Sequence, residues 1–284
     1  MLEAPEALYL SEQINRAASG KTIIEVVAGY TPHKFAWFNG PADAYPERLT
    51  GQRVGRAVAR GGMIDIPIGT DTHLLFSDGV NLRYYGPGES LPPKHQLLIG
   101  FDDDSCLVAS VRMYGSLSCF RENESLQAFA AYYEAAKTKP QVMSDAFTLS
   151  YFLELIDREE VRQKTVKAFL ATEQRIPGLG NGVLQDILYE AHLHPKRKIN
   201  TLSLKEKETL YSSVCAVLGR MYAAGGRHSE TDLYGRRGAY HATLSSQTAG
   251  HPCPSCGETI RKENYLGGSI YYCPGCQPPE PCTD

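Results

Sequence analysis

The spacing of apolar residues changes near residue 20 and divides the first 120 residues into two kinds of structure. Residues 5–18 carry apolar side chains at helical spacing, with Pro5 in the first turn and Gly20 after the last, which predicts one amphipathic helix. From residue 22 to about residue 120, short β-rich runs are divided by Gly, Asp and Pro. This part predicts a β-sandwich or flattened barrel with the helix beside it.

After Arg121 the apolar spacing becomes helical. Segments with apolar residues three and four apart are residues 125–137, 145–157, 159–171, 182–193 and 203–225. Asp145, Asp157 and Ser203 stand where N-caps are expected. We therefore expect an all-α half that ends near Gly225–Gly226.

The order of these patterns predicts an α+β multidomain protein. We expect a β-sandwich domain with a flanking helix over residues 1–124, a helical domain over residues 125–240, and a cysteine-containing module over residues 241–284. A polar, Gly-rich stretch through Gly250 links the last two.

Four cysteines in the last module have the spacing of a metal site. The pairs Cys253-x2-Cys256 and Cys273-x2-Cys276 are separated by 16 residues. Two such knuckles complete a tetrahedron of thiolates around zinc and leave no open position, so the predicted cofactor is one structural zinc ion. A pair of disulfides or four free thiols is the alternative reading of the same spacing.

Composition and charge narrow the possible partners and compartment. The net charge is −3, but residues 161–240 hold thirteen Lys and Arg against seven acids, which suggests a local basic face or a solvated helical surface. The acidic N-terminus does not resemble a signal peptide, and no apolar run reaches the roughly 20 residues of a membrane helix. We expect a cytoplasmic protein with no membrane partner.

The other cysteines fit a reducing compartment. Cys106, Cys119 and Cys215 lie in apolar stretches and are predicted to be buried thiols, whereas Cys282 in the Pro-rich tail has no predicted role.

A glycine-rich turn joins two predicted helices at residues 175–182, Arg-Ile-Pro-Gly-Leu-Gly-Asn-Gly. Such a turn at a helix N-terminus exposes backbone N–H groups that favour an anion, of which phosphate is the obvious one. Gly180 and Asn181 are therefore candidate DNA-binding residues, although a plain turn between helices would have a similar sequence.

Taken together, these features resemble the formamidopyrimidine-DNA glycosylase/endonuclease VIII family. The resemblance rests on the N-terminal Glu3-Ala-Pro-Glu6, on PGLGNGVLQDILYEAHLHP as a helix–two-turn–helix element, and on LYGRRG followed by CPSCG and YYCPGCQ as a zinc finger. KHQLLIGF and VRMYG stand where that family has a His-containing strand and an Arg/aromatic loop. The order of four features, over nearly the whole chain, makes the resemblance specific.

The resemblance implies a monomeric base-excision repair protein that binds damaged double-stranded DNA at the nucleoid of a bacterial-type cell. Family members flip an oxidised base out of the stack, cut the glycosidic bond and nick the backbone. Their nucleophile is an N-terminal proline amine, and an adjacent glutamate acts as acid and base. The corresponding positions here are Leu2, Glu3 and Glu6, with Arg112 and Tyr114 as fillers of the void behind a flipped base.

This chain departs from the family pattern at four positions. Leu2 replaces the proline, and because a large second residue prevents removal of Met1, the free amine is expected one residue out of place. Gly62 stands for a lysine, Gly268 for a phosphate-binding arginine, and Ser77 for an intercalating methionine.

Substitutes for the missing cations are few. In the finger, Arg261 and Lys262 could replace the arginine from the other arm of the hairpin. Another lysine, such as Lys94, could supply an amine.

Three functions fit these residues. The first is a DNA glycosylase and abasic-site lyase acting on oxidised bases, with activity doubtful because Leu2, Gly62 and Gly268 replace functional residues. The second is a non-catalytic protein that binds lesions or abasic sites, and the third is a zinc-finger protein that binds RNA. Retention of Glu3 and Glu6 favours the first, whereas the replaced residues favour the second.

Overall fold

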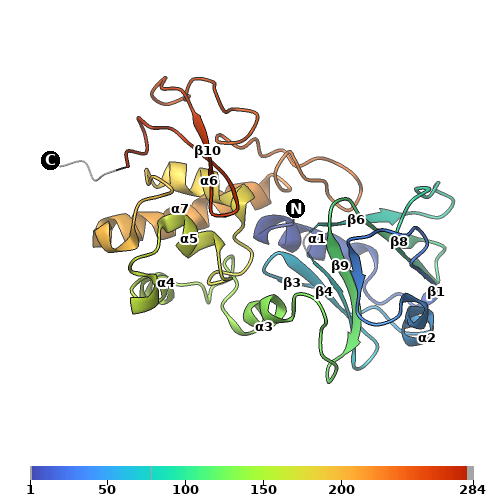
Figure 1. Ribbon diagram of the computed structural model, residues 1–284. Coiled ribbons are helices and arrows are strands. Elements are labelled where there is room, and N and C mark those ends of the chain that lie inside the picture. Colours follow the sequence, from blue (N-terminus) through green and yellow to red (C-terminus); the bar gives the residue numbers. More distant parts are fainter. Residues whose placement is uncertain (1, 78, 280–284) are drawn as a thin grey trace.

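Two β-sheets with one helix beside them form the N-terminal half of a computed structural model that describes residues 2–77 and 79–279 (Figure 1). Met1 and Cys282 lie outside these residues. The first sheet has four antiparallel strands, in the order β1 (Ile23–Ala28), β7 (Leu97–Phe101), β8 (Cys106–Val111), β6 (Val80–Tyr85). The second has five, in the order β2 (Ala36–Phe38), β9 (Gly115–Arg121), β5 (Thr72–Phe76), β4 (Met63–Ile68), β3 (Val58–Arg60).

The N-terminal helix α1 (Ala4–Ala17) connects the β half to the helical half. Its apolar residues, among them Leu10 and Ile14, join the core between the sheets. Helix α1 also packs against α7 (Leu204–Ala223) of the other half. In Figure 1, α1 lies at the centre of the molecule. The expected helix over residues 5–18 is therefore present, and it lies where the two halves meet.

The helical half has its own apolar core, and all of its α-helices but α3 contribute buried residues to it. The α-helices that follow the β half are α3 (Ala130–Thr138), α4 (Leu149–Ile156), α5 (Val166–Ala171), α6 (Asn181–Glu190) and α7. Shorter helical turns are η1 (Ala42–Ala44), α2 (Tyr45–Leu49), η2 (Glu159–Val161) and η3 (Ile199–Thr201). Helix α3 packs instead on the five-stranded sheet, where Tyr133 donates a 2.8 Å hydrogen bond to buried Asp65.

Several predicted helix boundaries are wrong for local reasons. The segment 159–171 forms η2 and then α5, because the Thr165 hydroxyl accepts from the Ala168 N–H and caps a new helix. Thr148, not Asp145, caps α4, and Asp157 ends α4 instead of starting a helix. Ser203 is confirmed as the cap of α7, in a capping box with Glu206.

A β-hairpin carries the last cysteines and lies over α6 in Figure 1. Its strands β10 (Arg261–Tyr265) and β11 (Gly268–Tyr272) are joined by Leu266 and Gly267, both in the left-handed region. Gly268 already pairs with Tyr265, so the turn consists of Leu266 and Gly267 alone.

The structure also tests the predictions about the cysteine thiols and about membrane-spanning helices. Cys119 is buried and Cys106 half-buried, but Cys215 is exposed on α7, so its prediction as a buried thiol is wrong. None of the helices in the described residues combines the length and apolar character needed to cross a membrane. The domain boundaries at residues 124 and 240 stay predictions.

Candidate nucleic-acid interface

The N-terminal segment is enclosed by two glycine-containing turns. The Ala4 N–H donates to the Gly178 carbonyl at 2.9 Å. A Cβ on Gly61 would lie 2.9 Å from the Gly178 nitrogen, and one on Gly62 would lie 2.7 Å from the Leu2 carbonyl oxygen. Gly61 and Gly178 also have positive φ angles. Backbone packing without side chains therefore fixes residue 2 between the β3–β4 turn and the turn before α6.

Glu3 links α1 to the N-terminus of α6. Its carboxylate accepts hydrogen bonds from the N–H groups of Gly182 at 2.8 Å and Val183 at 2.7 Å. Burial raises the pKa of Glu3, whereas Arg227 acts in the opposite direction. A Cβ on Gly180 would lie 2.5 Å from Glu3, so only glycine lets the carboxylate approach. Glu3 thus occupies two N–H groups that a phosphate could otherwise take.

A buried arginine neutralises the two N-terminal glutamates. The guanidinium of Arg227 donates to Glu6 through Nε at 2.8 Å and Nη2 at 2.9 Å, and Nη1 lies 3.6 Å from Glu3 Oε1. Although burial opposes its charged form, the glutamates raise the pKa of Arg227 above its ordinary value. Sequence reasoning missed Arg227 because nothing local distinguishes it from the other twelve Lys and Arg of residues 161–240.

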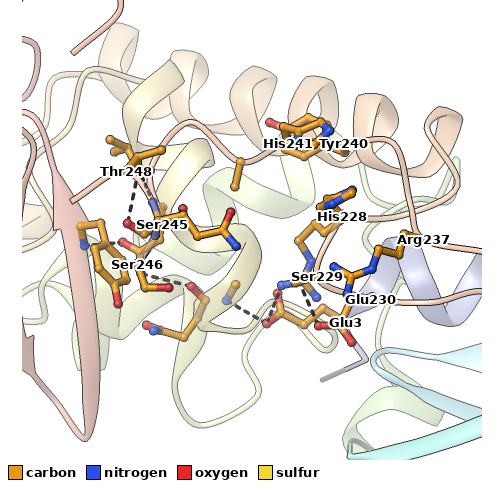
Figure 2. A pocket seen from close by; sticks show the side chains of 18 residues that line it. Glu3, His228, Ser229, Glu230, Arg237, Tyr240, His241, Ser245, Ser246 and Thr248 are labelled. Carbon is orange, nitrogen blue, oxygen red and sulfur yellow. Dashed lines mark hydrogen bonds and ion pairs between the residues drawn. The ribbon is translucent and has the colours of Figure 1, made fainter. Parts of the chain in front are cut away.

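A polar cavity of about 450 Å³ opens beside Glu3 and Asn181. Figure 2 shows Glu3, His228, Arg237 and Tyr240 around it. The imidazole rings of His228 and His241 stack with centroids 4.4 Å apart. Acidic and basic side chains both line the cavity, so it offers hydrogen-bond donors and acceptors to a polar ligand.

A second cavity, of about 220 Å³, brings together residues predicted to act at one place. Leu2, Arg112 and Tyr114 all line it, together with Met113 and Glu230. Met113 is 67% exposed at the loop between β8 and β9, and sequence reasoning did not select it. Its position between Arg112 and Tyr114, which were both selected, could have indicated that Met113 belongs to the same site.

Asn181 contacts the hairpin. Its Nδ2 donates to the Ser269 carbonyl at 2.7 Å, and the amide of Gln185 donates to the same oxygen at 3.2 Å. Asn181 Oδ1 is buried and has no hydrogen-bond partner among the described residues. Lys167 of α5, which sequence reasoning also missed, donates to the Tyr265 carbonyl near the hairpin tip. Helices α5 and α6 therefore hold the hairpin from below.

Arg261 and Lys262 are exposed but lie away from the hairpin tip. They pair with Tyr272 and Tyr271, whereas the pair next to the turn is Tyr265–Gly268. A Cβ on Gly268 would lie 3.5 Å from Asn181 Nδ2, so position 268 and Asn181 are neighbours. The two cations are not brought to that point, and their contact with DNA stays a prediction.

The four cysteine sulfurs of the last module converge. Their Sγ atoms all lie within 4.8 Å of one another, with Cys253 and Cys276 3.7 Å apart and Cys256 and Cys273 3.3 Å apart. A disulfide needs about 2.05 Å, whereas tetrahedral zinc with Zn–S of about 2.3 Å places sulfurs roughly 3.8 Å apart. The cluster is therefore compatible with one structural metal ion.

Comparison with known proteins agrees with this architecture. Residues 139–232 match the model of the formamidopyrimidine-DNA glycosylase H2TH domain. Formamidopyrimidine-DNA glycosylases of Bacillus cereus and Geobacillus kaustophilus are 24% and 28% identical to this chain, and the matches cover 98% of this chain and 99% and 100% of the relatives. The chain is therefore similar to formamidopyrimidine-DNA glycosylases over nearly its whole length, and its helical half matches their H2TH domain.

Solved structures of this family share the fold. A complex of the Lactococcus lactis protein with DNA containing an abasic site has a TM-score of 0.80 at 22% identity, covering 97% of this chain and 99% of that one. A MutM complex with DNA containing carbocyclic 8-oxo-G has the same TM-score and coverage at 23% identity.

The structure shows the surroundings of three positions at which this chain departs from the family pattern. Leu2 is buried in the core of the β half, and Gly62 donates its N–H to the Tyr132 hydroxyl at 2.7 Å. Ser77, the position matched to an intercalating methionine, is fully buried and accepts from the Ser116 N–H at 2.7 Å. The catalytic roles of Leu2, Glu3 and Glu6 stay predictions.

We expect Arg227→Leu to destabilise the protein by about 3 kcal/mol near neutral pH, because it leaves two buried carboxylates without a cation. The raised pKa of Glu3 means that its protonated form contributes stability at low pH, which is lost as the pH rises through the folded pKa. Without Arg227 that pKa rises further, so the deficit should shrink between about pH 7 and about pH 5. Denaturant unfolding at both pH values measures it.

Arg220→Leu is the matched control, because Arg220 forms a half-exposed ion pair with Glu190 at 2.9 Å. It should cost less than about 1 kcal/mol. An equal loss in the two variants would contradict a central role for Arg227.

Proposed function

We propose that the protein binds damaged duplex DNA in base-excision repair, with cleavage chemistry much weaker than a proline amine supports. The observation that carries the proposal is the meeting of Leu2, Glu3 and the Arg112–Tyr114 loop beside two cavities. The relatives' names and the DNA in the matching structures support it. We further propose that it acts as a monomer at the nucleoid, in the cytoplasm of a bacterial-type cell.

Duplex DNA would lie across the junction between the β half and the helical half. Arg112, Met113 and Tyr114 would face the gap left by a displaced nucleotide, and the cavity beside Glu3 would take a planar base. Asn181 would bind backbone phosphate through its side-chain amide, since Glu3 already occupies the Gly182 and Val183 N–H groups.

The amine chemistry of this site is limited by two features. With Met1 retained, the nitrogen of Leu2 is an amide and cannot attack a sugar carbon. A side chain at Gly62 would collide with the Leu2 carbonyl, so no lysine amine is available there. Lys94 is exposed and lines neither cavity. These features favour the second candidate, a non-catalytic protein that binds lesions or abasic sites.

The cysteine cluster would hold one structural zinc ion. Four thiolates fill the coordination shell, so the ion would fold the hairpin and carry out no chemistry. The hairpin contacts α6 through Asn181 and Gln185 and packs near the polar cavity through Tyr271. The zinc would therefore act on DNA binding indirectly, by holding these contacts in place.

For metal removal, we expect about one zinc per chain, and a loss of duplex affinity of more than about tenfold when Cys273→Ser or a chelator removes it. Metal analysis and fluorescence anisotropy with labelled duplex measure the two quantities. Cys215→Ser, which changes an exposed thiol outside the cluster, should leave both unchanged. Full affinity in the metal-free protein would exclude this role.

Duplex binding should weaken steeply as salt concentration rises, because cationic contacts to phosphates release counterions. Asn181→Ala should lower affinity about tenfold for damaged and undamaged duplex alike, since phosphate contacts carry no base sequence. Asn200→Ala, at an exposed amide in η3, is the matched control. Salt-independent binding, or preference for single-stranded RNA, would support the RNA-binding alternative instead.

Borohydride should trap little or no covalent adduct between the protein and abasic-site duplex, because an amide nitrogen at Leu2 forms no Schiff base. Intact mass of the N-terminal peptide shows which amine exists, and gel electrophoresis detects the adduct. Leu2→Pro, which permits Met1 removal and supplies a secondary amine, is the comparison and should trap more. Efficient trapping by the unmodified chain, mapped to residue 1 or 2, would overturn the proposed weakness.

A further inference from the structure

An exposed aromatic surface runs along the edge of the five-stranded sheet. Strand β2 is the edge strand next to β9 and carries Trp37, and Phe35 lies in the turn just before it. Phe35 is 46% exposed and Trp37 is 38% exposed. Large apolar side chains gathered in one exposed area are typical of a binding surface.

This surface continues into the loop that faces the cavity beside Leu2. The Gly115 N–H donates to the Phe35 carbonyl at 2.9 Å, which joins β2 to the end of the loop. The Trp37 ring centroid lies 6.2 Å from that of Tyr114 and 5.9 Å from that of Phe129. We define the aromatic strip as the set Phe35, Trp37, Met113, Tyr114 and Phe129.

Cations accompany the strip at both ends of the Phe35–Tyr114 part. Residues 30–37 contain Lys34 and His33 and no acid, and Arg112 stands at the other end. Lys34 Nζ lies 5.3 Å from the centroid of the Phe35 ring. Aromatic rings interleaved with cations are the surface that single-stranded nucleic acid recognises, because every base has a face that stacks and the backbone is anionic. An apolar protein partner would not need the cations.

We infer that the aromatic strip is a stacking platform for unpaired bases next to the lesion. This inference rests on the proposed binding of damaged DNA and specifies which form of damaged DNA the protein prefers. Bases of a strand that leaves the Arg112–Tyr114 loop would stack on Trp37 and then on Phe35. The protein would consequently bind a lesion in locally unpaired DNA more tightly than the same lesion in a fully paired duplex.

Trp37 is the single tryptophan of the chain, so its fluorescence reports on the strip alone. The full-length protein is titrated with abasic-analogue DNA in two forms, fully paired and with the flanking bases unpaired. We expect the unpaired form to quench the Trp37 emission strongly and the paired form to quench it little. Anisotropy should show that Trp37→Ala weakens binding of the unpaired form about tenfold and of the paired form less than about twofold.

Three comparisons make the outcome decisive. Trp37→Phe keeps a stacking ring and should retain most of the affinity for unpaired DNA. Tyr234→Ala removes an exposed aromatic ring that packs near Tyr84, outside the strip, and should leave both DNA forms bound as before. Circular dichroism of each variant shows that the fold is kept.

The inference fails if unpaired DNA binds without quenching Trp37, or if Trp37→Ala binds both forms like the unmodified protein. Either result, with duplex binding intact and sensitive to Asn181→Ala, would leave the proposed function standing and point to a protein partner for the strip. Absence of binding to every DNA form would overturn both.

Discussion

The buried charge network of Glu3, Glu6 and Arg227 holds the whole candidate site together. Two carboxylates from the start of α1 meet one guanidinium from the segment after α7, and all three side chains are removed from water. Such charges are stable in a protein interior only when they are paired and hydrogen-bonded. The additional N–H donors of α6 complete the bonding of Glu3. The network therefore fixes the N-terminus against the helical half, which no packing of the sheets alone would do.

The two departures at Leu2 and Gly62 are physically one change. The Leu2 carbonyl oxygen lies 2.7 Å from the point that a Cβ on residue 62 would occupy, and the Tyr132 hydroxyl accepts from the Gly62 N–H. A larger residue at position 62 would have to displace the backbone of the N-terminal segment at Leu2. Burying the Leu2 side chain in the β core stabilises the present arrangement by about 2 kcal/mol. This packing holds the N-terminal segment firmly against the β3–β4 turn.

The features that could be predicted from the sequence are those that depend on residues close together in the chain. The apolar stripe of α1, the N-cap at Ser203 and the spacing of the four cysteines each lie within one segment, and each is found in the structure. The fold class followed from their order. Phe129, in contrast, adopts a left-handed backbone conformation, which is unusual for phenylalanine and could not be predicted. Helix α3 therefore starts later than its apolar spacing suggests.

Partners distant in sequence were not predictable. Arg227 lies 221 residues from Glu6, and only the folded chain shows which of many cations joins the glutamates. The same holds for Lys167, whose partner is a backbone carbonyl of the hairpin. The aromatic strip also needed the structure, because the parallel pairing of β2 with β9 is what brings Trp37 beside Tyr114.

Because position 268 is glycine and not arginine, another side chain would have to link the hairpin to a DNA phosphate. One amide hydrogen of Asn181 is used by the Ser269 carbonyl, which leaves the other for a second acceptor. A phosphate oxygen is only an acceptor, so a single amide can bond the hairpin and the DNA backbone together. Glycine at 268 leaves this amide uncovered, whereas a longer side chain would lie against it. Position 268 thus supplies no positive charge of its own, but one neutral side chain could still set the register between hairpin, α6 and phosphate.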